Sequence, residues 1–246
     1  MKVFHLFGEY IMLLVKVFTK HEKFKIYYTQ TVKEIDKLGI QSIGIVAIIS
    51  VFMGAVITLQ TAYNTENPLL PDYLIGLGTR DSILLEFSST IIALILAGKV
   101  GSNIASEIGT MRVTEQIDAL EIMGVNSASY LILPKIVATV LFNPFLTMLS
   151  IFVGIIGGWA AGVSAGVISS QQYIEGIRYA FIPYYITYAL IKTVFFAFII
   201  TTISAFYGYR VQGGSLEVGQ ASTKAVVTSS VFILLFNLIL TQLLLS

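Results

Sequence analysis

The sequence has no cysteine and only two histidines, His5 and His21, which both lie close to its start. Without cysteine the chain cannot form a disulfide, a thiolate metal site or a cysteine nucleophile. Because neither histidine lies in the long apolar segments, a histidine triad or metal cluster within those segments is excluded. We therefore expect no catalytic residue, no metal site and no cofactor bound by this chain.

Charged residues are scarce as well. They make up 12% of the 246 residues, whereas soluble domains contain about 25%. The formal net charge is +1, so the chain lacks the basic balance typical of nucleic-acid binding, and we expect no nucleic-acid partner. Hydrophobic residues account for 56% of the chain, and the mean hydropathy is +0.83. This composition is typical of an integral membrane protein.

Several stretches of mostly apolar residues are long enough to cross a bilayer, which takes about 20 helical residues. We place five spans, at residues 39–62, 83–104, 132–158, 182–207 and 226–245. The second is the least apolar, because it is interrupted by Glu86, Ser88, Ser89, Thr90 and Lys99. The sequence thus predicts an all-α integral membrane protein whose transmembrane domain covers residues 39–246.

The N-terminal segment, residues 1–38, has a different pattern. Apolar side chains recur there at three- and four-residue spacing, at Phe4, Phe7, Ile11, Leu14, Val15 and Phe18. With the lysine-rich stretch that follows, this pattern favours an amphipathic helix on the membrane surface; a sixth, short span is the alternative. Glu9 and Lys16 break the apolar run and no small-residue cleavage site follows, so we do not expect a cleaved signal peptide.

Basic residues in short loops mark the cytoplasmic side of a membrane. They gather before the first span, between spans two and three, and between spans four and five, at Lys2, Lys16, Lys20, Lys23, Lys25, Lys33, Lys37, Lys99, Arg112, Lys135, Arg210 and Lys224. The other two loops contain only Arg80 and Arg178. We therefore predict a cytoplasmic N-terminus and, after five crossings, a C-terminus on the outer side.

A charged segment, EIGTMRVTEQIDALEIMGV, separates spans two and three at residues 107–125. Val113, Ile117 and Leu120 have the spacing of one helix face, and Gly124 suits a helix C-terminus. We predict one amphipathic helix over residues 107–124 on the cytoplasmic side. Spacing alone fits a helix that docks on a partner and a helix that rests on the membrane equally well.

The same segment resembles the signature of the MlaE-type permeases. These are subunits of ABC transporters that work with MCE (mammalian cell entry) proteins in lipid trafficking. The resemblance continues in AGKVG at 97–101, LPK at 133–135 and GIIGG at 154–158, and it covers most of the chain from the first span onward. It implies a bacterial inner-membrane permease that moves phospholipid, or a similar lipid, between that membrane and an MCE-domain carrier on the outer side.

The resemblance also implies partners. The cytoplasmic helix would insert into a groove of an ATPase dimer, and its docking candidates are Arg112, Glu115, Asp118 and Glu121. Two ATPase subunits require two such helices, so a permease homodimer is expected, and the family allows a small regulatory subunit on the ATPase. The chain itself has no G-x-x-x-x-G-K-[ST] loop, since Gln220 and Ala221 follow the glycine spacing of residues 214–219. ATP and Mg would therefore be bound by the partner.

Three polar side chains inside the predicted spans are candidates for a lipid path, namely Glu86, Lys192 and Asn237. A charge within the hydrocarbon costs at least about 2.5 kcal/mol unless it is paired or hydrated. All three lie where they could face one outward-leaning cavity. The resemblance implies that Glu86 and Lys192 line the lipid path, and a purely structural buried pair is the alternative.

Two departures from the family pattern affect this site. Leu85 stands where an arginine is common, and Asn237 replaces an acidic residue that some members have. Glu86 and Lys192 are then a self-balanced pair. On the first span, Met53, Ile57 and Gln60 share a face, and the resemblance suggests that they help to wall the lipid cavity.

Two other functions fit the residues. A secondary transporter or channel could use Glu86 and Lys192 as an ion or proton relay, and a membrane scaffold could anchor soluble partners. No plastid transit peptide is evident, so we expect a bacterial rather than a plastid membrane.

Overall fold

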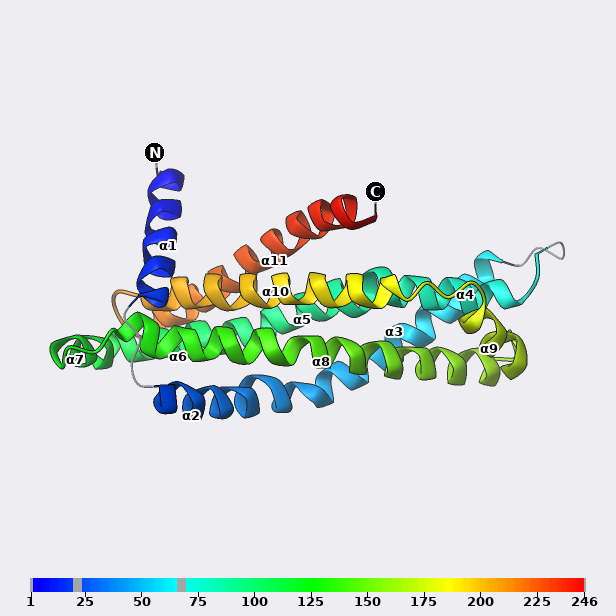
Figure 1. The fold of residues 1–246 in the computed structure, drawn as a ribbon, viewed down its shortest axis with the longest axis horizontal. Coiled ribbons are helices and arrows are strands. Elements are labelled where there is room, and N and C mark those ends of the chain that lie inside the picture. The colour runs from blue at the N-terminus through cyan, green and yellow to red at the C-terminus, as the bar shows by residue number, and fades with distance from the viewer. Residues whose placement is uncertain (1, 20–23, 66–69, 246) are drawn as a thin grey trace. The chain divides into compact units, whose positions relative to one another are not determined.

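A computed structural model of the chain describes residues 2–19, 24–65 and 70–245. All regular secondary structure in these residues is helical (Figure 1). The α-helices are α1 (Lys2–Phe18), α2 (Phe24–Glu34), α3 (Ile43–Asn64), α4 (Tyr73–Ser82), α5 (Ile92–Leu96), α6 (Ser102–Val113), α7 (Gln116–Ile122), α8 (Ser127–Ser164), α9 (Ser170–Arg178), α10 (Tyr184–Tyr209) and α11 (Ser215–Leu245). The predicted all-α fold is confirmed.

Five long helices of the described chain are apolar enough to cross a membrane: Lys25–Asn64, Tyr73–Val113, Ser127–Ser164, Tyr184–Tyr209 and Ser215–Leu245. Each covers most or all of one predicted span, so the chain is a multi-pass membrane protein. Most extend beyond the predicted bounds, because a helix can continue into polar sequence once it has left the hydrocarbon.

The predicted division at residue 38 does not coincide with a helix end. Residues 25–38 continue directly into the first span, through a π-helical turn at Ile35–Gly39 and a 3₁₀ turn at Ile40–Ser42. The N-terminal segment is therefore two elements, the separate helix α1 and a second helix that is part of the first long one. At 17 residues, α1 is not among the five candidate spans.

The second long helix is interrupted by two π-helical segments, Ile83–Ile91 and Ala97–Gly101. They coincide with the polar residues that weaken this span in the sequence. π-helical turns are rare and occur frequently at functional sites. Residues 83–91 contain Glu86, and residues 97–101 contain Lys99.

The chain forms two compact units, which we describe separately. One, called the first unit, comprises the described residues of 1–41, 93–143 and 194–246, and the other, the second unit, comprises those of 42–92 and 144–193. The lysines and arginines of the second unit are Arg80, Arg178 and Lys192. Most basic residues therefore belong to the first unit.

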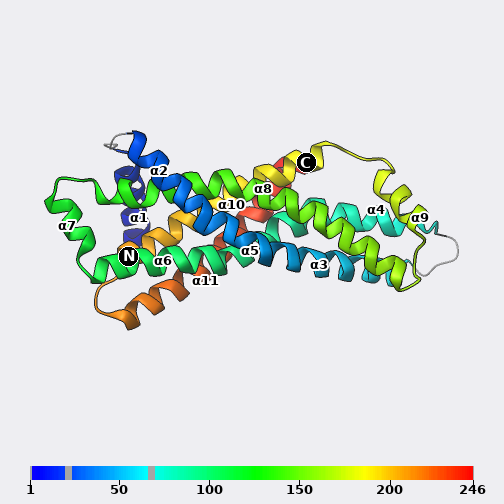
Figure 2. The ribbon, with the colours of Figure 1, turned by 90° about the horizontal axis from the view of Figure 1, so that it is seen from below.

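In the second unit, α4 packs against both α3 and α9 (Figure 2). Glycines permit close contacts here, since a side chain at Gly54 would collide with the carbonyl of Gly154 on α8, and one at Gly176 with the carbonyl of Tyr73. Such small-residue contacts are typical of membrane helices, where packing rather than the hydrophobic effect holds helices together.

In the first unit, α6 packs against α11, and α1 packs against the C-terminal part of α10. The Tyr10 hydroxyl lies 2.8 Å from that of Thr202, and the Tyr10 ring meets Phe206 edge-on at 5.6 Å. The opposite side of α1 is open, with Phe4 84% and Met12 64% exposed. The N-terminal end of α1 projects away from the other helices of this unit (Figure 1), as an amphipathic helix with one unburied apolar face.

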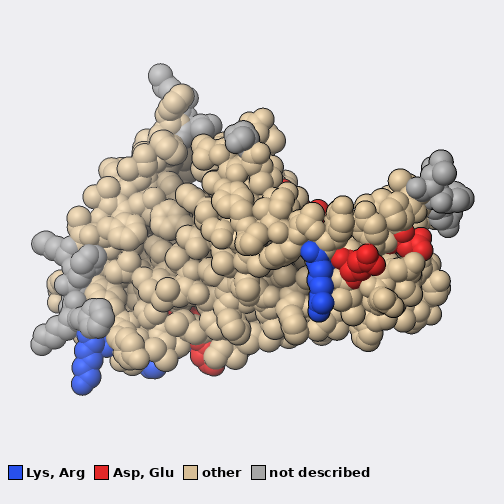
Figure 3. Space-filling model, turned by 45° about the vertical axis from the view of Figure 1, so that its right-hand side comes forward, with Lys and Arg blue, Asp and Glu red and all other residues tan. Residues whose placement is uncertain are grey.

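Apolar side chains dominate much of the surface. Large ones are exposed along the membrane helices, among them Leu141, Phe145, Phe152, Val231, Leu238 and Leu243. On the face drawn in Figure 3, charged side chains are few and scattered. Exposed apolar surface of this extent is expected of helices whose solvent is lipid.

Candidate functional site

A buried ion pair joins α10 to the π-helical segment 83–91 in the second unit. The Lys192 side chain is fully buried, and its ammonium donates to Glu86 Oε1 at 3.1 Å, to the Leu85 carbonyl at 3.1 Å and to the Tyr188 hydroxyl at 3.0 Å. An ammonium has three donors, so each of them has an acceptor. Thr90 donates to the other carboxylate oxygen of Glu86 at 3.0 Å.

The two partners of this pair differ in exposure. Lys192 is inaccessible, whereas 41% of the Glu86 side chain is exposed. A buried ammonium is stable only when it is paired and hydrogen-bonded, and Glu86 is the ion-pair partner of Lys192. The carboxylate of Glu86 is therefore partly accessible, whereas all three donors of the Lys192 ammonium are bonded to protein groups.

The other predicted lipid-path residues have different surroundings. Met53 lines a small cavity of about 10 Å³ in the second unit, together with Ser50, Phe87, Ser88 and Ser150 among others. A volume of this size holds about one water molecule. Ser88 is buried with its hydroxyl unpaired, and Ser50 donates to Ser150 at 2.8 Å.

Ile57 and Gln60 do not continue the cavity lining. Ile57 is buried in a core cluster with Ile83, Leu84, Ile151 and Ala189. Gln60, one turn further along α3, is exposed. Asn237 lies on α11, in the first unit, so a cavity shared by Asn237, Glu86 and Lys192 stays a prediction.

The cytoplasmic segment differs from the prediction, because the single helix expected over residues 107–124 is two helices. Residues 107–113 are the end of α6, and a break at Thr114 and Glu115 separates them from α7. Glu115 has φ 60°, in the left-handed region, where a right-handed helix cannot continue. The predicted common face is therefore divided between two helices: Val113, on α6, packs against Val211, Val218 and Ala221, whereas Ile117, on α7, is fully buried.

The predicted C-terminal stop is confirmed. Gly124 has φ 79°, and its N–H donates to the Glu121 carbonyl at 3.0 Å, while the N–H of Val125 donates to the Leu120 carbonyl at 3.0 Å. These two bonds form a Schellman motif, which glycine permits because it has no Cβ. The seven-residue helix α7 therefore has a sharply defined end, and it projects beyond the ends of α6 and α8 (Figures 1 and 2).

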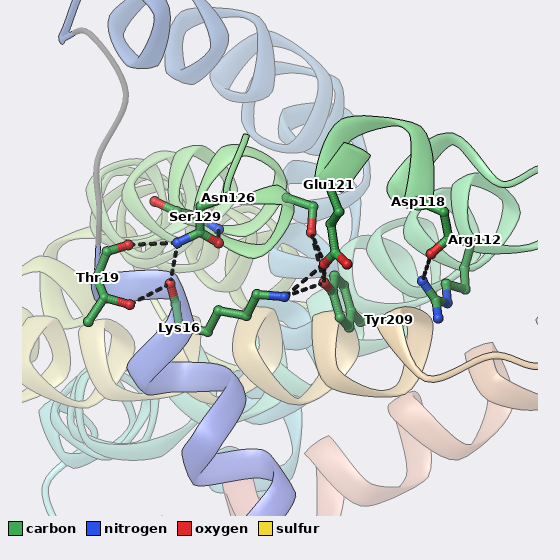
Figure 4. Close-up of polar contacts among 9 residues, drawn as sticks. Lys16, Thr19, Arg112, Asp118, Glu121, Asn126, Ser129 and Tyr209 are labelled. Carbon is green, nitrogen blue, oxygen red and sulfur yellow. Dashed lines mark hydrogen bonds and ion pairs between the residues drawn. The ribbon is translucent and has the colours of Figure 1, made fainter. Parts of the chain in front are cut away.

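The four docking candidates differ in what they contact. Arg112 and Asp118 form an ion pair of 2.6 Å across the break between α6 and α7 (Figure 4). Glu121 accepts hydrogen bonds from Lys16 at 2.8 Å and from Ser127 at 2.8 Å. Glu115 is exposed at the break itself. Of these four side chains, only that of Glu115 has no hydrogen bond or ion pair to another described residue.

The pKa of Glu121 is lowered from 4.5 to about 2. The largest cause is the hydrogen bond from the Lys16 ammonium, and the second is the hydrogen bond from the Ser127 hydroxyl. A carboxyl whose pKa is lowered by folding is stabilised in its charged form above its ordinary pKa. The contribution of this ion pair to stability, which is small because both side chains are nearly half exposed, is therefore complete above about pH 4.5 and is lost as the pH falls towards about 2. Glu121 remains charged throughout the physiological range.

Sequence reasoning missed two features of the first unit. The end of α7 exposes two apolar side chains, Ile122 (88%) and Met123 (68%); their position directly before the glycine stop is the signal that could have found them. Lys135, for which no partner was predicted, is buried on α8, 2.6 Å from Glu34 and 2.7 Å from Glu107. Lys37 reaches Glu107 as well, at 2.9 Å.

The structure also bears on the glycine-rich stretch between spans four and five. The helix α11 begins at Ser215, so that residues 215–219 are helical and the connection from α10 is only residues 210–214. Residues 215–219 are therefore part of a helix and not of a loop.

The chain is similar to known proteins over most of its length. A probable ABC transporter permease of Rickettsia bellii is 34% identical over 96% of this chain and 91% of its own length. The intermembrane phospholipid transport system permease MlaE of Haemophilus influenzae is 34% identical over 87% and 82%, respectively. A chloroplast protein of Arabidopsis thaliana, TRIGALACTOSYLDIACYLGLYCEROL 1, is 32% identical over 89% of this chain and 63% of its own length.

The model of the family "Permease MlaE" matches residues 31–243. This range includes the ion pair between Glu86 and Lys192, the whole α6–α7 segment and all five long helices except their outermost residues. The chain, a transport component by its relatives, belongs to the MlaE permease family.

Proposed function

We propose that this chain is the permease subunit of an ABC transporter that moves phospholipid, or a similar lipid, between the bacterial inner membrane and an MCE-domain carrier. The observation that carries the proposal is the α6–α7 segment, a short helix outside the long spans with its own fixed ends, within a chain of the MlaE family. The Haemophilus relative, named as a phospholipid permease, supports the choice of lipid.

The ATPase partner binds ATP and Mg, and α7 docks into it. The side chain of Ile117 is fully buried and holds α7 against the rest of the first unit, while Glu115, Ile122 and Met123 are exposed. The exposed apolar side chains of Ile122 and Met123, with the Glu115 carboxylate on the same short segment, are more favourably placed in a groove of another protein than in water. Because each ATPase subunit needs one such helix, the permease acts as a homodimer, and a small regulatory subunit would contact the ATPase.

The lipid path runs beside Glu86 and Lys192. A neutral ion pair is tolerated near hydrocarbon, and the partly exposed carboxylate gives a lipid headgroup a polar surface to pass. The π-helical backbone of residues 83–91 supports a functional role, since π-helical turns are rare and occur frequently at functional sites.

The lysines and arginines of the first unit lie on the cytoplasmic side of the membrane, as the positive-inside rule requires. The N-terminus is then cytoplasmic and the C-terminus periplasmic. The open apolar face of α1 lies in the inner leaflet, and the MCE carrier meets the permease on the outer side.

Coexpression with the ATPase and the MCE protein encoded by the same organism tests this function. We expect an ATPase to copurify, and lipid to move from proteoliposomes to the carrier only with hydrolysable ATP. A complex whose ATPase lacks its nucleotide-binding lysine is the control. Lipid movement that follows an ion gradient instead would identify a secondary transporter, and partners bound without any transport would identify a scaffold.

A further inference from the structure

We propose that Glu121 is a positioning residue whose hydrogen bonds connect the docked helix α7 to α1, α8 and α10. When the ATPase displaces α7, these three helices then move with it. This inference rests on the proposed function, because it assigns how movement of the docking helix is passed on. It also removes Glu121 from the docking surface on which the sequence placed it.

Three helices donate to one oxygen atom. Glu121 Oε1 accepts from Lys16 Nζ of α1 at 2.8 Å, from Ser127 Oγ of α8 at 2.8 Å and from Tyr209 Oη of α10 at 3.0 Å (Figure 4). The donors also contact each other, with 2.8 Å between the two hydroxyls and 3.3 Å between Lys16 and Tyr209. A single carboxylate therefore joins α7 to three other elements of the first unit.

A second group of contacts holds the same end of α1. The side-chain amide of Asn126, between α7 and α8, donates to the carbonyls of Lys16 at 2.8 Å and Thr19 at 2.7 Å. Its oxygen accepts from the Ser129 N–H at 3.3 Å. The last carbonyls of a helix have no partner within that helix, so Asn126, in the connection between α7 and α8, caps α1.

The role of Glu121 is mechanical rather than stabilising. About half of each partner is exposed, 45% of Lys16 and 42% of Glu121, and exposed ion pairs contribute little to folding. The packing of α7 comes from Ile117, which is fully buried. Removing the carboxylate should thus leave α7 folded and docked, while α1, α8 and α10 no longer follow it.

No other acid on α7 can take this role. Asp118, the other acidic residue among 116–122, pairs with Arg112 on α6 at 2.6 Å. Its contact therefore connects α7 back to the helix that precedes it. The link to α1, α8 and α10 passes through Glu121 alone among the acids of this helix.

The test compares Glu121→Lys, Lys16→Glu and the double variant in the complete transporter with ATPase and carrier. The readouts are the amount of ATPase copurified, ATP turnover and lipid moved per ATP hydrolysed. We expect each single variant to retain the ATPase and its turnover but to move less lipid per ATP, by on the order of tenfold. The double variant restores the ion pair with the two charges exchanged, and it should regain much of the lipid moved per ATP hydrolysed.

A matched control is Glu9→Gln. Glu9 lies on α1 and forms a 2.7 Å ion pair with Arg210, directly after α10, so its loss weakens the attachment of α1 without touching α7. We expect lipid moved per ATP to stay near the wild-type value. An equal loss of lipid moved per ATP in Glu9→Gln would overturn the proposal. Transport would then depend on the packing of α1 against α10 and not on its contact with α7.

The absence of native cysteine allows a direct mechanical test with Lys16→Cys and Glu121→Cys in one chain. Without a cross-linker this variant should lose coupling as the charge variants do, and a bifunctional thiol reagent of side-chain length should restore it. Should the Glu121→Lys chain itself fail to fold, Glu121→Gln, which keeps the shape of the side chain, takes its place.

The inference fails if Glu121→Lys moves wild-type amounts of lipid per ATP, or if cross-linked α1 and α7 abolish transport. It also fails if the charge variants lose the ATPase, since Glu121 would then belong to the docking surface. If the wild-type complex itself binds no ATPase or moves no lipid with ATP, it is the proposed function that is wrong.

Discussion

Among single residues, Lys192 of the second unit depends most on its neighbours. Its ammonium is fully buried and its three donors rely on three protein acceptors. Replacing Glu86 with lysine would place two ammonium groups together. Breaking a fully buried ion pair costs about 3–5 kcal/mol, and less here because 41% of Glu86 is exposed. We expect Glu86→Lys to impair lipid transfer in proteoliposomes, and added Lys192→Glu to restore part of it.

The comparison must be made at equal amounts of folded complex, so that transfer rather than yield is measured. Tyr188 and the Leu85 carbonyl would face a glutamate in the double variant, and the tyrosine can donate to it while the carbonyl cannot. Rescue should therefore be partial. Additive losses in the two single variants and the double variant would argue against direct pairing.

Lys135 is the corresponding residue of the first unit, placed between Glu34 and Glu107 with 3% of its side chain exposed. Lys135→Met removes the charge that separates the two carboxylates, leaving Lys37 to pair with Glu107 alone. We expect a melting temperature several degrees lower in detergent, as for a loss of about 1–3 kcal/mol. Lys224→Met, at an exposed lysine of α11, should change it little, and equal shifts would contradict the burial argument.

Among the elements, the break between α6 and α7 depends on one backbone conformation, φ 60° at Glu115. Glycine adopts it without strain, whereas proline is fixed near φ −65°. Glu115→Gly should keep α7 in place and raise stability by about 1 kcal/mol or less. Glu115→Pro should displace α7, so that the ATPase no longer copurifies. A Glu115→Pro complex with a normal ATPase content would show that docking does not need this geometry.

The same break marks the limit of what could be predicted from the sequence. Hydropathy located all five long helices, because the apolar requirement of a bilayer is strong and continuous over each one. The break was missed because glutamate carries no signal for a left-handed conformation, unlike Gly124, which was placed correctly. The pair of Glu86 and Lys192 could be proposed from charge in a span, but the three helices that meet at Glu121 could not, since Lys16 is 105 residues away.

For the whole molecule, the uneven charge of the two units predicts the direction in which the chain crosses the membrane. Gln212 lies in the connection between α10 and α11 of the first unit, and Gln171 lies on α9 of the second. Both are exposed, and with no native cysteine each can be replaced singly. In intact cells, a membrane-impermeant maleimide should label Gln171→Cys, while Gln212→Cys should react only after lysis. Because the lysines and arginines that set topology gather in the first unit, the reverse labelling would mean that they do not face the cytoplasm, and α7 could not then meet an ATPase there.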